Sequence, residues 1–179
     1  MPVANKLSQV YDGVEDRILV LSEDAEGEIY RLWLTQRMTN KVILALVKWL
    51  GEQSASQLPQ ISPATAQTWN QAAAVSQFIP SAPVDVGASA PSSAPAEPPA
   101  SLAAEGLVRS VDVQRSGDSY MLIFHLGSEP TLASAFTAVE LRQWLSILHG
   151  LYQTAGWSME VWPSWMENPI ATAAPNSVN

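Results

Sequence analysis

Residues 14–52 carry the pattern of a β-hairpin followed by an amphipathic helix. Residues 17–21 form a short apolar run after Arg17 that is typical of a strand. In 29–34, a second predicted strand, Tyr30, Leu32 and Leu34 fall on one face and Ile29, Arg31 and Trp33 on the other. In 38–49 the apolar positions instead recur every three or four residues, as on one face of a helix. Gly51 stands where a helix C-cap is expected. The first segment is therefore predicted to fold as strand, turn, strand and helix.

Residues 105–166 repeat this order with one more strand. Turns rich in Gly, Ser, Asp and Pro separate three apolar strands, and a helix follows the last of them. The four predicted elements are 107–115, 120–126, 132–136 and 138–152. Thr137 and Glu140 have the spacing of a capping box at the start of that helix. After Gly156, residues 157–162 are expected to return as a last strand.

The two segments are predicted to build one α+β domain. A segment of about 40 residues seldom buries enough apolar area to fold alone. Together the segments support one antiparallel sheet of four to six strands with two amphipathic helices on one face. The shared order of elements reflects either an internal duplication or a chance similarity. The first half could join the second half of its own chain or of another copy, so a strand-exchanged homodimer stays open.

A long linker separates the two halves. Residues 53–104 contain eight of the 13 prolines and only two charged residues, Asp85 and Glu97. Proline removes backbone donors, and the abundant Ala and Ser bury little area, so the linker is predicted to be disordered. The terminal segments 1–13 and 167–179 are likewise expected to be flexible.

One part of the linker differs from the rest. Residues 64–79 contain no proline, and their larger side chains recur at helical spacing. The recurring positions are Trp69, Ala72, Val75 or Ser76, and Ile79. Two interpretations stay open: a short helix that docks on its own chain or on a partner, and a nascent helix within a disordered linker.

Composition and charge remove several functional classes. The chain of 179 residues has 9 Lys and Arg against 17 Asp and Glu, which gives a formal net charge of −8, and it has no Cys. Without Cys there is no disulfide scaffold, thiolate metal site or Cys nucleophile, and the acidic balance argues against a duplex-binding protein. Since no secretory signal and no run of about 18 apolar residues is present, we expect a cytoplasmic protein without a membrane span.

The residue pattern nominates no catalytic or metal site. His125 is predicted to lie in a strand and His149 near the end of the second helix, without metal-ligand spacing between them. The acidic run in 23–28 lacks the alternating oxygen ligands of a calcium loop and is interpreted as a solvated turn. We therefore expect no enzyme activity, no cofactor and no bound metal.

The tryptophans carry the main functional prediction. Seven in 179 residues is several times the usual frequency, and Trp is enriched at interfaces because it combines a large area with a polar N–H group. The residues assigned to a partner interface are Trp33, Trp69, Trp144, Trp162 and Trp165. The predicted function is a non-enzymatic interaction or assembly subunit, whose partner is another protein or a second copy of the chain.

The first segment also supports an alternative function. Arg31, Trp33, Arg37 and Lys41 interleave cations with an aromatic ring, as in surfaces that hold single-stranded nucleic acid. The order of two sheet-plus-helix units resembles that of the PUR and Whirly single-strand binders. A salt titration separates the two functions, because nucleic-acid affinity falls steeply with added salt and aromatic docking of a protein does not.

Overall fold

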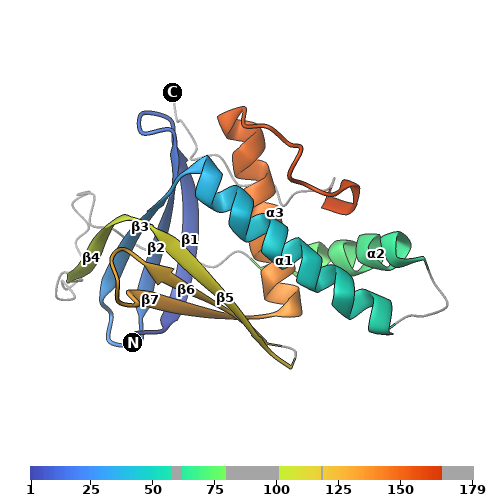
Figure 1. The fold of residues 1–179 in the computed structure, drawn as a ribbon, viewed down its shortest axis with the longest axis horizontal. Coiled ribbons are helices and arrows are strands. Elements are labelled where there is room, and N and C mark those ends of the chain that lie inside the picture. The colour runs from blue at the N-terminus through green and yellow to red at the C-terminus, as the bar shows by residue number, and fades with distance from the viewer. Residues whose placement is uncertain (58–61, 80–100, 118, 167–179) are drawn as a thin grey trace, which may run out of the picture.

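Two β-sheets and three α-helices make up the part of the chain that the computed structural model describes, which is residues 1–57, 62–79, 101–117 and 119–166. Figure 1 shows the helices gathered on one side of the strands. The elements in chain order are β1 (Ala4–Asp12), β2 (Arg17–Asp24), β3 (Ile29–Leu34), α1 (Gln36–Gln57), α2 (Pro63–Ser76), β4 (Leu102–Leu107), β5 (Ser110–Ser116), β6 (Ser119–His125), β7 (Leu132–Thr137), α3 (Ala138–Ala155) and a 3₁₀ turn, η1 (Ser164–Met166).

The α+β class is confirmed, but the single antiparallel sheet is wrong. Strands β1 to β4 form a mixed sheet in that order, and β5 to β7 form a separate antiparallel sheet. β4 runs parallel to β3, and the chain between them, which includes α1 and α2, supplies the long crossover that parallel pairing needs. The two sheets meet where Val108 donates its N–H to Trp33 O at 2.9 Å and Arg109 donates to His125 O at 2.8 Å.

The N-terminal segment is a strand, which corrects the expectation that residues 1–13 are flexible. β1 pairs with β2 from Ala4 to Asp12, and Val3 forms an isolated bridge with Ala133 of β7. Leu7 and Tyr11 of β1 pack against the main core. Their four-residue spacing places both on one face of a strand, and this apolar contact together with the β2 ladder orders the segment.

Parts of the expected linker are also regular structure. α1 continues to Gln57, α2 occupies Pro63–Ser76 and β4 begins at Leu102. The helix expected in 64–79 is therefore present, and it contacts α1, α3 and η1 of its own chain. The rest of the expected linker, 58–61 and 80–100, and the expected C-terminal tail, 167–179, lie outside the described residues.

The apolar stripe predicted for α3 is buried as expected, whereas α1 is buried on a face that only partly coincides with its predicted stripe of Met38, Val42, Ala45 or Leu46, and Trp49. On α3 the stripe Leu141, Leu145, Leu148 and Tyr152 is fully buried, and on α1 the buried positions are Val42, Ile43, Leu46 and Leu50. The capping box of Thr137 and Glu140 is present, and Gly156 ends α3 in the left-handed conformation with φ 65°. The inner faces of both sheets join these residues in one hydrophobic core.

Candidate interaction surfaces

The five tryptophans assigned to a partner interface lie in different environments. Trp69 on α2 is 58% exposed, whereas Trp144 on α3 is only 5% exposed. Trp33, Trp162 and Trp165 are half-buried. The structure therefore leaves Trp69 as the member of this set with the most ring surface open to a partner.

Trp33 and Arg31 project from the face of β3 that is opposite the main core. There Trp33 packs against a second, smaller cluster formed by Leu19, Leu21 and Ile29. The Arg31 guanidinium lies 3.5 Å from Glu105 of the neighbouring strand, so its charge already has a partner.

The other two residues of the nucleic-acid alternative lie elsewhere. Arg37 and Lys41 are exposed and four residues apart on α1, and Lys41 lines a cavity between α1 and β5. The structure thus divides the predicted group into a pair on the outer sheet face and a pair on the helix.

The segment after α3 closes the core instead of forming the expected strand at 157–162. Trp162 packs edge-on against Tyr152, with ring centroids 5.3 Å apart. Trp165 lies against the Arg142 guanidinium at 5.2 Å, and Met166 is fully buried. The Trp162 N–H donates to Met159 O and the Met166 N–H to Pro163 O, both at 3.0 Å, so the backbone of this segment forms local turns in place of strand pairing.

His149 is buried where the C-terminal segment packs against α3. Its ring is 5% exposed and meets the Trp162 ring edge-on, with centroids 5.0 Å apart. Burial lowers the pKa of His149 below its ordinary value of 6.5, because the charged imidazolium is poorly solvated there. His149 thus has a structural position between α3 and the C-terminal segment.

We expect the free energy of unfolding to fall as the pH drops below about 6.5. The unfolded chain then binds a proton at His149 that the folded state resists, so protonation favours unfolding. His149→Phe keeps an aromatic ring and removes this proton uptake. Thermal unfolding of both proteins across a pH series checks this. An equally steep decline in the variant would contradict a role of His149.

α2 is docked by hydrogen bonds from its polar side. Gln67 Nε2 donates to the backbone oxygen of Leu50 on α1 at 2.6 Å, and Gln67 Oε1 accepts from Arg142 Nη2 on α3 at 2.5 Å. Gln71 Nε2 donates to Arg142 O at 3.3 Å, and Gln143 Nε2 donates to Ala74 O at 2.9 Å. These bonds fix the rotation of α2 about its own axis, because turning the helix would break all of them.

The side of α2 that faces the protein is therefore not the apolar stripe that the sequence singled out. Its buried residues are Ala66, Gln67, Gln71 and Ala74. Trp69 points away from the helices that hold α2, and Ile79, just beyond the helix end, is 84% exposed. Sequence reasoning missed Gln67, Gln71 and Arg142. The four-residue spacing of the two glutamines between small residues was the available signal.

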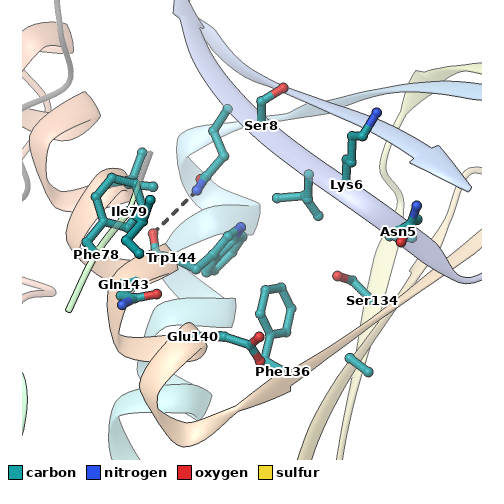
Figure 2. A pocket seen from close by; sticks show the side chains of 15 residues that line it. Asn5, Lys6, Ser8, Phe78, Ile79, Ser134, Phe136, Glu140, Gln143 and Trp144 are labelled. Atoms are coloured by element: carbon teal, nitrogen blue, oxygen red, sulfur yellow. Dashed lines mark hydrogen bonds between the residues drawn. The ribbon is translucent and has the colours of Figure 1, made fainter. Parts of the chain in front are cut away.

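A cavity of about 300 Å³ lies between β1, β7 and α3, with the residues after α2 at its border. Figure 2 shows Trp144 and Phe136 in the space where the two edge strands diverge. Both charged side chains that line it are engaged: Lys6 pairs with Glu23 at 3.0 Å, and Glu140 accepts from the Thr137 N–H at 2.7 Å. Among the described residues that line the cavity, neither charged side chain is left without a partner.

The remaining candidates for chemistry are also separated. His125 Nε2 lies 3.0 Å from Asp112 Oδ2, and His149 is on another element. Among the described residues, no three His, Asp or Glu side chains come together in an arrangement that could hold a metal ion. None of the helices seen in the described part of the chain has the length and apolar character needed to cross a bilayer.

The comparisons with known proteins give no relative from which a role could be transferred. No protein-family model, no curated protein and no solved structure matches this chain.

Proposed function

We propose that the protein acts by binding protein, without catalysing a reaction, through the outward face of α2. This face is defined by Trp69 and the residues three, four and seven positions after it, which are Ala72, Ala73 and Ser76. One observation carries the proposal: α2 buries two glutamines while its tryptophan stays 58% exposed. Amphipathic helices ordinarily bury their most apolar side, so this orientation leaves a hydrophobic face available.

The energetic gain from covering Trp69 is large for one side chain. Burying the ring area that remains exposed would contribute about 2–3 kcal/mol, at about 25 cal/mol per Å². The polar bonds of α2 are made on the other side of the helix and would not be disturbed. A partner can therefore gain this energy without displacing α2.

The small residues beside Trp69 favour another helix as the contacting element. Ala72, Ala73 and Ser76 allow a second helix axis to approach closely, since interaxial distance depends on the side chains at the contact. A second copy of the chain can supply such a helix through its own α2, in a two-fold arrangement. One helix pair buries less than the roughly 800 Å² per partner of a standard interface, so the self-association is expected to be weak.

Trp69→Ala is expected to abolish self-association while leaving the fold intact. Sedimentation velocity over a concentration series should show wild-type mass rising above the monomer and the variant remaining monomeric. The thermal unfolding midpoint should change little, because truncation of a largely exposed side chain leaves the core intact. The tryptophan can be replaced safely since more than half of it is exposed.

Leu107→Ala is the matched control. Leu107 is 43% exposed on β4, far in sequence from α2, and its truncation removes apolar surface of the outer sheet face. The control should associate like the wild type. A monomeric wild-type protein at every concentration, or equal loss of association in both variants, would contradict self-association through α2.

A further inference from the structure

The cations of this acidic chain are distributed unevenly. Lys6, Arg17 and Arg31 pair with carboxylates at 3.0, 3.4 and 3.5 Å, and Arg142 is buried. The other five of the nine Lys and Arg residues are exposed and make no salt bridge within the described residues. They lie on α1, on β5 or just before β5, and are Arg37, Lys41, Lys48, Arg109 and Arg115.

Two of these cations line a groove between α1 and β5. Lys41 and Arg109, which are 68 positions apart, line one cavity of about 260 Å³. We call it the α1–β5 groove, lined by Met38, Lys41, Val42, Ala45, Arg109, Ser110, Val111 and Val113. Figure 1 shows α1 and β5 running side by side, so the groove is bounded by a helix on one side and an edge strand on the other.

The positive charge continues along the groove. The three cations of α1 recur on its exposed side over about 16 Å of helix. At the end near the α1 C-terminus, Trp49 and Tyr120 have ring centroids 6.4 Å apart, and the Arg115 guanidinium lies 5.8 Å from the Tyr120 ring. Arg115 is two positions beyond the groove residue Val113 on β5, so it lies on the same face of this strand as Val111 and Val113.

The floor of the α1–β5 groove is apolar, and the acidic residue of β5, Asp112, faces away from it. Met38, Ala45, Val111 and Val113 are half-buried in the floor. Asp112 alternates with these valines, so it lies on the opposite face of β5. The groove thus combines an apolar floor with cations whose charge is not neutralised by the strand that carries them.

We propose that the α1–β5 groove binds an acidic segment of a partner protein that carries apolar side chains between its carboxylates. Carboxylates would meet the cations at the border, and the apolar side chains would cover the floor. Such charge complementarity steers association and rejects partners of the wrong sign. This surface is separate from the outward face of α2, so it adds a second binding activity to the one proposed above.

The lining of the groove favours an acidic protein over a nucleic acid. Single-stranded nucleic acid gains much of its affinity from bases stacked on aromatic side chains. The groove lining contains no aromatic residue, and Trp49 near its end is half-buried against Tyr120. An apolar floor without an open ring suits Leu, Ile or Val side chains better than bases.

The test is selection from a displayed library of random peptides on the immobilised full-length protein. Pools recovered on the wild type should be rich in peptides that combine Asp or Glu with aliphatic residues. Lys41→Glu with Arg109→Glu should remove this enrichment. Lys6→Glu with Arg17→Glu, which changes the net charge equally away from the groove, should keep it. Fluorescence anisotropy of a recovered peptide should show about tenfold weaker binding to the groove variant.

Three results would overturn the proposal. The first is a wild-type pool without acidic enrichment, and the second is the same enrichment on the groove variant. The third is that oligothymidylate, or a second copy of the chain, binds the wild type more tightly than the recovered peptide does, and that the groove variant loses this binding. Circular dichroism verifies that each variant is folded. Lys41→Gln with Arg109→Gln replaces the charge-reversal variant if that variant unfolds.

Discussion

Gln67→Leu is expected to lower the free energy of unfolding by about 2–3 kcal/mol, although it places an apolar side chain at a buried position. Gln67 is 3% exposed, and its Oε1 accepts from the guanidinium of Arg142, which is also 3% exposed. Burial lowers the pKa of Arg142 to about 10, so the guanidinium is still charged at neutral pH. Leucine would remove a charge-assisted bond in a site that water does not reach.

The double variant separates this cause from a simple loss of packing. Arg142→Met should lower the free energy of unfolding by less than Gln67→Leu does, because it removes the buried charge together with the need for an acceptor. Combining the two changes should give a protein that is more stable than Gln67→Leu alone. Urea unfolding of the four proteins measures the coupling, and additive free energies would contradict a direct Arg142–Gln67 interaction.

These bonds also explain which part of α2 could be predicted. The helix itself was indicated by the proline-free segment with helical spacing, and it spans Pro63–Ser76. Its docking side depends on Arg142 and on the Leu50 carbonyl, which only the tertiary fold brings beside it. Local periodicity ranks apolar positions alone, so it favoured the Trp69 side and missed the glutamines.

Some strand pairings could likewise be predicted from the local sequence, and others could not. The hairpin of β2 and β3 and the capped α3 follow from alternation, turn residues and the Thr137–Glu140 box, all of which are local. The parallel pairing of β3 with β4 joins residues about 70 positions apart and leaves no local signal. β1 was missed because only Leu7 and Tyr11 mark its inner face strongly.

The α1–β5 groove is a surface that the sequence could predict only in part. Arg37 and Lys41 were singled out because they are neighbours on one helix. Arg109 and Arg115 join them only because β5 lies beside α1 in the fold. The net charge of −8 is an average over the whole chain, and it conceals a face on which the cations of α1 and β5 gather.

Trp157→Ala is expected to be the most destabilising single substitution, at about 3–5 kcal/mol. The Trp157 ring is 8% exposed and meets two tyrosines edge-on, Tyr152 at 5.0 Å and Tyr11 at 5.7 Å between centroids. It therefore joins α3 to β1, and alanine would leave a cavity between the two elements. Urea unfolding near neutral pH measures the loss, and a loss below about 1 kcal/mol would show that the site collapses around alanine.

Trp157→Phe isolates the polar part of this contact. Phenylalanine keeps ring packing but removes the indole N–H, which donates to Asp16 Oδ1 at 2.8 Å. The pKa of Asp16 is lowered below 3.8, first by this bond and second by the bond from the Tyr11 hydroxyl. The ionised Asp16 therefore stabilises the fold above pH 3.8, and this stabilisation disappears as the pH falls through the folded-state pKa. The phenylalanine variant should lose less stability on acidification than the wild type. If both proteins lose stability equally between mildly and strongly acidic pH, the Trp157–Asp16 bond does not stabilise the ionised carboxylate. Ring packing alone then links the C-terminal segment to the β1–β2 turn.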